Sequence, residues 1–320
     1  MPGSRRWCSV ASEARATHPF YQGGTVVTVG TFDGVHRGHQ DVLERLVRRA
    51  DAAGLAALLI TFEPHPLEVV RPESAPLLLS PGVERLEAVV ECGVRHVAIV
   101  PFTPGFAQLS AEQFVDDVLL RRFGMRELLI GHDHGFGRGR AGDVDVLRRL
   151  GAARGFAVEV VDAVTTADGR PISSTLVRSL VSAGELAAAA EALGRRYGLV
   201  GRVVEGAGRG RRLGYPTLNI ALAHPRKLLP PIGVYAVLVE TPRGRFGGMM
   251  NLGPRPTFGD EAVLLEAHLF EAAGEFYGGT VRLEFVSRLR DVMRFPSPAA
   301  LVEQLSRDSE SARRALTQVL

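Results

Sequence analysis

Short apolar runs alternate with amphipathic stretches along the first half of the chain. The runs are nearly continuous in apolar residues, which is typical of strands that are buried on both faces. They occupy residues 25–29, 56–61, 96–100, 127–130 and 157–161. The stretches between them repeat apolar residues with the period of a helix, at 40–50, 82–92 and 111–123. This alternation predicts a doubly wound parallel α/β sheet, in which ligands bind at the carboxyl ends of the strands.

The pattern changes near residue 173. Residues 173–181 and 185–193 have the pattern of two short helices, the second of which ends at Gly194. Beyond them the chain is rich in glycine and in short strand patterns, at 199–205, 233–240, 246–252, 263–269 and 280–286. That density of strands and turns predicts a small antiparallel β-barrel.

A terminal helix follows the barrel pattern. Ser297 is a good N-cap residue and Pro298 suits the first helical turn, so we expect a helix at about 299–316. The patterns divide the chain into an N-terminal extension, an α/β domain and a barrel domain with a terminal helix. These cover residues 1–22, 23–195 and 196–320. The extension carries no regular pattern, and we expect it to be poorly ordered.

The composition is that of a globular protein. Of the 320 residues, 46% are hydrophobic and 23% are charged, which excludes a disordered chain, a collagen and a coiled coil. No apolar run approaches the roughly 20 residues of a membrane span, and none follows the N-terminus as in a secretory signal. The only two cysteines, Cys8 and Cys92, point to a reducing compartment, so a cytoplasmic location is expected.

Charge does not indicate a nucleic acid or a membrane as a partner, because the formal net charge is only +3. Lys227 is the only lysine among 38 basic residues, and a genome-wide codon bias explains most of the arginines. Arginines in phosphate-binding loops would be the exception, because arginine binds phosphate oxygens in pairs. A transient homo-oligomer stays open.

The first candidate site follows the first strand. Residues 29–39 read Val-Gly-Thr-Phe-Asp-Gly-Val-His-Arg-Gly-His, so a strand ends, glycines turn the chain and a helix begins. The N-terminus of a helix offers free N–H groups and the positive end of a dipole to phosphate. His36 and His39 share one helix face, and Gly38 between them lets a ligand approach the backbone. Two imidazoles in that place can stabilise negative charge on a phosphoryl group.

Two other interpretations of these histidines remain. They could be surface or capping residues, or they could bind a metal, since histidines three positions apart on a helix can chelate. No third ligand stands nearby in a recognisable pattern, which disfavours the metal.

Two loops of the first half have the chemistry of a ligand site. His65 lies between two prolines, which hold it in a stiff, extended loop or a rigid turn. The second loop, residues 131–143, is rich in glycine, so its N–H groups could bind phosphate with Arg138 and Arg140 as charge partners. Its His-Asp-His triplet at 132–134 is weak evidence for a metal, because alternate residues of an unconstrained loop do not define a site.

A Ser/Thr-rich segment starts the helix predicted from residue 173. Ser173, Ser174 and Thr175 suit a helix N-terminus, which is compatible with nucleotide binding at the same place. Arg178 follows one turn later, where it could reach a polyphosphate.

The second candidate site is a glycine-rich segment of the barrel half. Residues 201–214 contain five glycines, too many for a regular strand, and lack the Gly-Lys-Ser/Thr of a P-loop. The segment suits either a flexible loop that closes over phosphates or a plain glycine-rich hairpin. Thr217 and Asn219 point the same way on an extended chain, and two neutral oxygen ligands suit a Mg²⁺ ion that keeps water.

The two halves resemble those of one known family. Segments 29–39, 61–66, 131–143 and 172–178 resemble motifs of the nucleotidylyltransferase superfamily, specifically the flavin adenylyltransferase half of bacterial bifunctional riboflavin kinase/FAD synthetases. Segments 201–219, 227–237, 251–259 and 265–270 resemble the riboflavin kinase half. The resemblance runs through residues 24–310 in the family's order. It implies a Rossmann-like domain of nucleotidylyltransferase type followed by a kinase barrel.

The resemblance also implies a role for each matched residue. His36 and His39 would be catalytic in the first half, and Glu266 would be the general base of the second half. The alternative for Glu266 is an ordinary glutamate on the solvated face of a strand. Thr217 and Asn219 would hold Mg²⁺. ATP and its phosphates would be bound by Gly30, Phe32, Asp33, Gly34, Gly38, Ser173, Ser174, Thr175, Arg178, Gly206, Gly210, Arg211 and Gly214. The flavin would be bound by His65, Asp133, Phe136, Asn251 and Arg255.

The family implies two consecutive reactions. The barrel half would phosphorylate riboflavin with ATP to give FMN, and the first half would adenylylate FMN with a second ATP to give FAD and pyrophosphate, with Mg²⁺ at both sites. One departure stands in the glycine-rich loop, where His134 replaces the usual phenylalanine. Two alternatives follow: a riboflavin kinase whose adenylyltransferase half is impaired, and a flavin-binding or flavin-sensing protein without turnover. A non-catalytic binder needs no base and no metal ligand, which argues against the second alternative.

Overall fold

The computed structural model describes residues 9–10, 23–131, 135, 137, 142–206, 210, 213–254 and 263–317. The chain forms two compact units. Residues Met1–Leu77 and Arg85–Ser173 make the first, which we call the sheet unit. Residues Leu78–Glu84 and Ser174–Leu320 make the second, which we call the barrel unit.

Parallel strands form the core of the sheet unit, in the order β1-β4-β3-β2-β5-β6. They are β1 (Ser9–Val10), β2 (Thr25–Val29), β3 (Ala56–Glu63), β4 (His96–Pro101), β5 (Met125–Gly131) and β6 (Ala157–Val161). The sequence predicts five of them, and the parallel α/β class is confirmed. It does not predict β1, which lies in the N-terminal extension and pairs with β4 at the edge of the sheet.

Helical segments connect these strands. They are α1 (Arg37–Ala53), α2 (Pro66–Val70), η2 (Pro72–Ser74), α3 (Val83–Glu91), η3 (Phe106–Gln108), α4 (Ala111–Gln113), η4 (Phe114–Arg122) and α5 (Val144–Arg154). Where the sequence predicts one helix at 111–123, the structure has a short α-helix that continues as a π-helix, η4. In its last turn the N–H of Phe123 donates to the carbonyl of Val118, five residues back, which is the wider π pattern.

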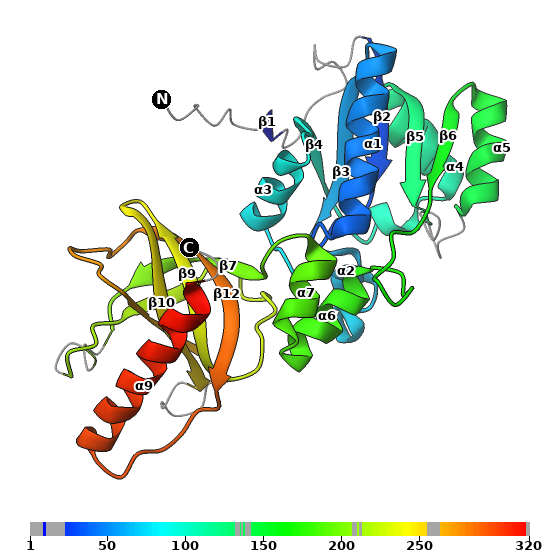
Figure 1. Cartoon of the computed structure of the whole chain (residues 1–320). Helices are drawn as coiled ribbons and strands as arrows, with labels where there is room; N and C mark the ends of the chain where they lie inside the picture. The colour runs from blue at the N-terminus through cyan, green and yellow to red at the C-terminus, as the bar shows by residue number, and fades with distance from the viewer. Residues whose placement is uncertain are drawn as a thin grey trace. The chain divides into compact units, whose positions relative to one another are not determined.

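Both faces of the sheet are buried because neighbouring residues of each strand point to opposite sides. On one face Val26 and Leu59 belong to a hydrophobic cluster with Leu43 of α1. On the other face Leu58 belongs to a second cluster with Leu119 of η4. Figure 1 shows α1 crossing the sheet, with the α4 segment and α5 behind it. Burial on both faces explains why these strands are nearly continuous in apolar residues.

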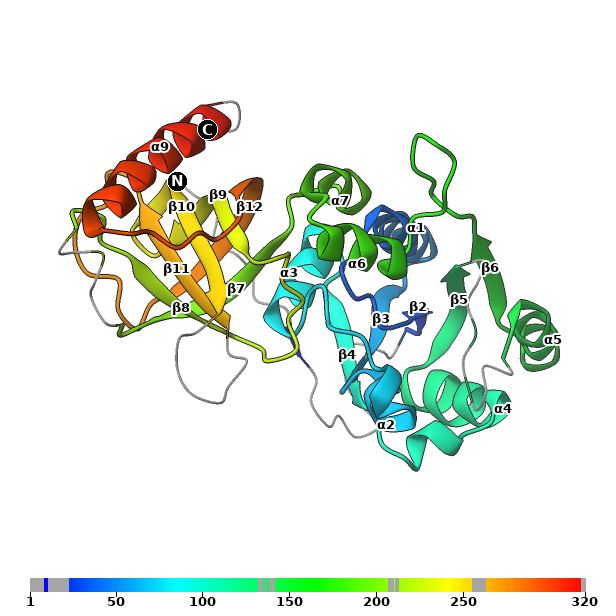
Figure 2. The ribbon, with the colours of Figure 1, turned by 90° about the horizontal axis from the view of Figure 1, so that it is seen from below.

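The barrel unit contains a closed antiparallel barrel with strand order β10-β11-β8-β7-β12-β9 (Figure 2). Its strands are β7 (Gly198–Val204), β8 (Leu218–Leu222), β9 (Gly233–Thr241), β10 (Gly244–Pro254), β11 (Val263–Leu269) and β12 (Thr280–Arg290). The unit also holds α6 (Ser174–Ala183) and α7 (Leu186–Leu193). The sequence predicts every one of these strands except β8, whose alternation is short and follows directly on the Pro-Thr pair of the glycine-rich segment.

The predicted terminal helix is α9 (Pro298–Leu316), and the side chain of Ser297 caps it by accepting from the N–H of Ala300. α9 runs along the barrel in Figures 1 and 2. Its carboxylate Asp308, only 4% exposed, is held by the guanidinium of Arg290 at 2.6–3.0 Å. This paired charge fixes the helix on the barrel, because a buried carboxylate needs a partner.

The single lysine of the chain ties residues Leu78–Glu84 to the barrel within the barrel unit. Lys227 is buried, and its Nζ donates to the carbonyl of Leu79 at 2.6 Å and to the Glu84 carboxylate at 2.5 Å. The same ammonium lies 4.4 Å from the centre of the Tyr197 ring, which adds a cation–π contact. The Glu84 carboxylate also accepts from the N–H of Val200 at 2.8 Å. The Lys227 ammonium therefore holds residues Leu78–Glu84 to the barrel through several contacts at once.

We expect Lys227→Met to lower the free energy of unfolding by about 3–5 kcal/mol, because removing one partner leaves the Glu84 carboxylate buried without its counter-charge. Urea unfolding of the full chain measures this loss. The double variant Lys227→Met/Glu84→Gln is the control, because it removes the orphaned charge and should recover part of the loss. A loss of only about 1 kcal/mol in the single variant, the scale of a surface ion pair, would contradict the prediction.

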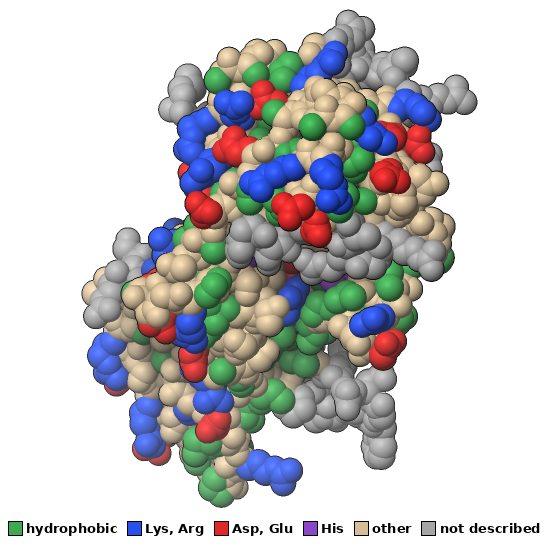
Figure 3. All heavy atoms as spheres, turned by 90° about the vertical axis from the view of Figure 1, so that its right-hand side faces the viewer, with side chains coloured by type: hydrophobic (Ala, Val, Ile, Leu, Met, Phe, Trp, Pro, Cys, Tyr) green, Lys and Arg blue, Asp and Glu red, His purple; other side chains and the backbone are tan. Residues whose placement is uncertain are grey.

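Acidic and basic side chains are interspersed on the face shown in Figure 3, in keeping with the small net charge. Within the part of the chain that the structure describes, no helix has both the length and the apolar character needed to cross a membrane.

Candidate functional site

The loop between β2 and α1 has an unusual backbone. Phe32, Gly34 and Val35 have positive φ angles of 48°, 86° and 40°. Glycine adopts such angles without strain, whereas Phe32 and Val35 are held there by burial. Strained backbone of this kind clusters at ligand sites. The turn starts α1 at the carboxyl end of β2, an inner strand of the sheet, which is where the sequence predicts a site.

His36 is the N-cap of α1. Its Nδ1 accepts a hydrogen bond from the backbone N–H of His39 at 3.3 Å. A neutral imidazole that accepts at Nδ1 carries its proton on Nε2, so Nε2–H is the group that can donate to a phosphoryl oxygen. The His39 ring stacks on the His36 ring with centroids 3.8 Å apart, and the Phe32 ring lies 4.6 Å from that of His39. The capping and catalytic interpretations are therefore compatible, because they use different ring nitrogens.

Gly30 and Asp33 complete the histidine loop, which we define as residues 30–36. The N–H of Gly30 donates to the carbonyl of Ile60 at 3.0 Å, so the loop starts while still joined to β3. Asp33 is only 2% exposed. A Cβ on Gly30 would lie 3.0 Å from the Phe32 ring, so glycine allows that ring to fold back over the strand end.

Gly38 lies where two segments of the sheet unit approach one another. A Cβ there would lie 3.3 Å from the His36 ring and 3.5 Å from the carbonyl oxygen of Ile172. Ile172 and Ser173 thus bring the beginning of the Ser/Thr-rich segment to the start of α1. The roles of Ser174, Thr175 and Arg178, which follow in α6, stay predictions.

A second loop follows β3, the neighbour of β2, and we call residues 63–66 the proline loop. His65 is the N-cap of α2: its Nδ1 accepts from the N–H of Leu67 at 3.2 Å, while the Glu68 carboxylate accepts from the His65 N–H at 3.3 Å. Of the two sequence interpretations, the structure has the rigid turn, in the form of a helix start with a capping box. A contact between His65 and flavin stays a prediction.

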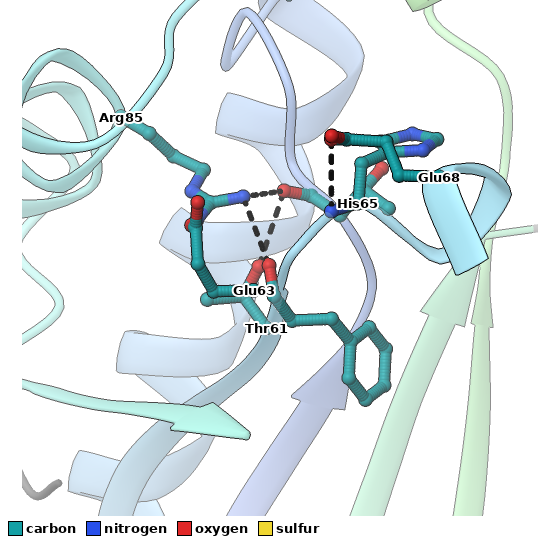
Figure 4. Close-up of polar contacts among 7 residues, drawn as sticks. Thr61, Glu63, His65, Glu68 and Arg85 are labelled. Carbon is teal, nitrogen blue, oxygen red and sulfur yellow. Dashed lines mark hydrogen bonds and ion pairs between the residues drawn. The ribbon is translucent and has the colours of Figure 1, made fainter. Parts of the chain in front are cut away.

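Arg85 of α3 reaches both loops (Figure 4). Its guanidinium donates to the carbonyl of Thr31 at 3.2 Å, to the carbonyl of Phe62 at 3.5 Å and to the Glu63 carboxylate at 2.8 Å. The motifs do not single out Arg85. A signal was available, because Arg85 shares the buried face of α3 with Ala88 and Val89, and a buried guanidinium requires partners.

Several predicted site residues fall outside the described residues. They are Asp133, Phe136, Arg138, Arg140, Arg211 and Arg255, together with the divergent His134. Their predicted roles stay predictions.

The strand register of the barrel brings three predicted site residues into one row. Glu266 of β11 pairs with Asn219 of β8 on one side and with Asn251 of β10 on the other. Residues paired directly across antiparallel strands lie on the same face, with Cβ atoms about 4.5–5.5 Å apart. All three are half-buried. A carboxylate between two amides has the composition of a site that binds a polar substrate and takes up its proton.

Gly206 approaches the end of this row. A Cβ at Gly206 would lie only 2.0 Å from Nδ2 of Asn219, so any side chain there must displace that amide. Gly210 is equally close to the backbone, where a Cβ would lie 2.2 Å from the carbonyl oxygen of Tyr215, and Gly214 turns the chain with a φ of 82°. Gly206 therefore lies directly against the side chain of Asn219, and Gly210 lies against the backbone just before Thr217.

His268 stands two residues after Glu266 on the same face of β11. Its Nδ1 lies 2.8 Å from the carbonyl oxygen of Pro216, the residue before Thr217. Its ring also contacts Tyr215, with centroids 5.2 Å apart. These contacts hold the approach to Thr217 against the strand of Glu266, which is consistent with a structural role for His268.

Comparisons with known proteins match both halves. The profile of the FAD synthetase family matches residues 19–176, and that of the riboflavin kinase family matches residues 193–316. A "bifunctional riboflavin kinase/FMN adenylyltransferase" of Pseudomonas fluorescens is 40% identical over 291 residues, which cover 91% of this chain and 92% of that protein. The protein of the same description from Escherichia coli strain K12 is 38% identical over 297 residues, covering 91% and 93%.

The chain belongs to the bifunctional riboflavin kinase/FMN adenylyltransferase family. In this chain the FAD synthetase match covers the histidine loop and its sheet, and the riboflavin kinase match covers the barrel strands that carry Asn219, Asn251 and Glu266. The resemblance read from the motifs is thereby confirmed. The two profiles leave residues 177–192 between them, and the domain boundary near residue 195 stays a prediction.

A solved structure shares the fold of this family member. A Streptococcus pneumoniae chain whose title names a macrolide-efflux protein is 30% identical, with a TM-score of 0.82, and the match covers 92% of this chain and 96% of that one. Among the described residues, no group of three His, Cys, Asp or Glu side chains could hold a metal ion.

Proposed function

We propose that this chain makes FAD from riboflavin in two ATP-dependent steps. In the barrel unit the 5′-hydroxyl of riboflavin attacks the γ-phosphorus of ATP, which forms FMN and releases ADP. In the sheet unit a phosphate oxygen of FMN attacks the α-phosphorus of a second ATP, which forms FAD and releases pyrophosphate. The chain's membership of the family supports both steps. The cytoplasmic location and the oligomeric state stay predictions.

In the kinase step, Glu266 would accept the proton of the riboflavin 5′-hydroxyl as that oxygen attacks. Asn251, its register partner on β10, would orient the flavin end, and Asn219, the partner on β8, lies on the side of the glycine-rich segment. Thr217 and Asn219 would hold Mg²⁺, which when bound neutralises charge on the ATP phosphates. The close approach of Gly206 fits this assignment, because it fixes the amide of Asn219 beside a loop whose N–H groups can bind phosphate.

In the adenylyl transfer step, the N-terminus of α1 would bind the ATP phosphates through its backbone N–H groups. The Nε2–H of His36 would donate to an oxygen of the α-phosphoryl group as negative charge develops there. His39 stacks on His36 and holds the ring in place. No protein base is needed, because the attacking FMN phosphate is already an anion.

The observation that carries the proposal is that each family segment has its own assembled group, His36 with His39 in one unit and Glu266 between two asparagines in the other. The test is to incubate the chain with riboflavin, ATP and Mg²⁺ and to separate the flavins by chromatography. FMN together with FAD is expected. FMN alone would favour the impaired adenylyltransferase, and unchanged riboflavin would contradict both.

Gly206→Ala should slow FMN formation by roughly 10- to 100-fold and raise the Mg²⁺ concentration required, because the new methyl group displaces the Asn219 amide and small misplacements cost that much. FAD formation from supplied FMN should stay within twofold. Gly105→Ala is the matched control, since the nearest atom to its Cβ position is 3.9 Å away. An unchanged Mg²⁺ requirement in Gly206→Ala would count against Asn219 as a ligand.

A further inference from the structure

Arg85 is a buried cation that no part of the two-step reaction uses. Its side chain is 8% exposed, and it lies in the sheet unit on the inner face of α3. Figure 4 shows the guanidinium pointing toward the end of β3, where Glu63 and Thr61 lie. The groups that accept its hydrogen bonds come from two loop origins, Thr31 after β2 and Phe62 with Glu63 at the end of β3.

The carbonyl of Thr31 accepts two side-chain hydrogen bonds. It accepts from Arg85 and also from the hydroxyl of Thr61 at 3.2 Å. Three of the next four residues, Phe32, Gly34 and Val35, have the positive φ angles of the histidine loop, and the segment leads directly to His36. On the other side, the Phe62 carbonyl and Glu63 carboxylate begin the chain that leads to His65. One guanidinium thus fixes where both loops leave the sheet.

Stability alone does not account for this arginine. The Nε–H of Arg85 is buried and finds no acceptor among the described residues, which is costly. Its ionic partner Glu63 is 47% exposed, so water would solvate that carboxylate if the arginine were replaced. A buried donor without an acceptor is a departure from ordinary packing rules, and such departures are common at functional sites.

We propose that Arg85 is a positioning residue of the FMN adenylyltransferase site, which holds the histidine loop in register with the proline loop. This inference rests on the proposed function of the sheet unit. Arginine suits the task because its planar fork donates in several directions at once, to two carbonyls and a carboxylate. A lysine ammonium could retain some of these bonds but not the whole set.

Arg85→Met should lower kcat for FAD formation from FMN by roughly 10- to 100-fold, because the histidines would no longer be held at the reacting phosphorus. The KM values for ATP and FMN should change by less than about threefold, because the lost positioning matters mainly in the transition state. Arg85→Lys should recover part of the loss. Riboflavin kinase activity of the same molecules, which uses the barrel unit, should stay within twofold and reports that the variants are folded.

Arg154→Met is the matched control. Arg154 makes a two-pronged ion pair with Asp116 at 2.5 and 3.0 Å in the same unit, and its hydrogen bonds hold the pKa of that carboxyl below its usual value. It touches neither loop, so its removal should leave FAD formation unchanged. Amide hydrogen exchange gives a second readout: Arg85→Met should accelerate exchange in residues 31–36 and 62–66, and Arg154→Met should not.

Three results would overturn the inference: full adenylyltransferase activity in folded Arg85→Met, an equal loss of both activities, or no acceleration of exchange in the two loops. If Arg85→Met does not fold, Arg85→Lys and Thr61→Val take its place, and each must lower kcat for FAD formation selectively. FAD formation by the unsubstituted chain is measured first. Its absence would contradict the proposed function itself, whereas its presence with an unaffected Arg85→Met contradicts only the role of Arg85.

Discussion

Glu266→Gln is expected to reduce FMN formation by about 10²- to 10⁴-fold, the usual contribution of a general base. Glutamine keeps the size and hydrogen-bonding reach of the side chain in the row with Asn219 and Asn251, but it cannot accept the proton of the riboflavin hydroxyl. FAD formation from supplied FMN should be unchanged. Initial rates of both reactions, measured by chromatography of the flavins, check the result.

Glu284→Gln is the control for this variant. Glu284 is another strand glutamate of the barrel, on β12, where it pairs with Arg245 at 3.2 Å on an exposed face. Its replacement should leave both activities unaltered. If Glu266→Gln kept more than about a tenth of the kinase rate, loss of the base would be far smaller than base catalysis requires, and Glu266 would not be the base.

His36→Ala should have the opposite selectivity. It should lower FAD formation from FMN by roughly 10²- to 10³-fold, the cost of removing one donor to a developing oxyanion, and leave FMN formation intact. The Nε2–H assigned from the cap geometry is the donor that is lost. Rates of FAD formation at saturating ATP and FMN measure the effect.

The alanine variant also removes the N-cap of α1, which by itself costs about 0.5–2 kcal/mol. His36→Asn separates the two effects, because asparagine is a good N-cap but does not place a donor where the imidazole Nε2–H stands. We expect His36→Asn to be as inactive as His36→Ala and closer to the unsubstituted chain in thermal unfolding. Recovery of the FAD-forming rate in His36→Asn would show that the histidine acts through the cap alone.

The secondary structure of both units follows largely from local patterns. The five predicted strands of the sheet unit are nearly continuous apolar runs because helices cover both faces. Ser297 and Pro298 mark the start of α9 through capping chemistry that any helix uses. Local patterns do not predict strand β8, because its five residues, next to a glycine-rich segment, are too few to show a clear period.

The two sites differ in how far the sequence reveals them. His36 caps the helix in whose first turn His39 lies, so their close spacing in the chain already predicts that the two rings are neighbours. Asn219, Asn251 and Glu266 come from three strands, and the motifs name them without placing them side by side. Only the register of β8, β11 and β10 makes them a row.

By itself, the sequence determined the fold class, five strands of the sheet, the terminal helix, the family and the histidine pair. These depend on residue periods, caps and spacings that act within a few positions of the chain. Only the tertiary structure decided the row around Glu266, the burial of Lys227 against Glu84 and the reach of Arg85 to two loops. Each of these joins residues far apart in the chain, and contacts between distant residues leave no periodic trace in the sequence. In the sequence, an arginine on a helix that faces water cannot be told from one that donates to two carbonyls. The packing of α3 decides which of the two Arg85 does.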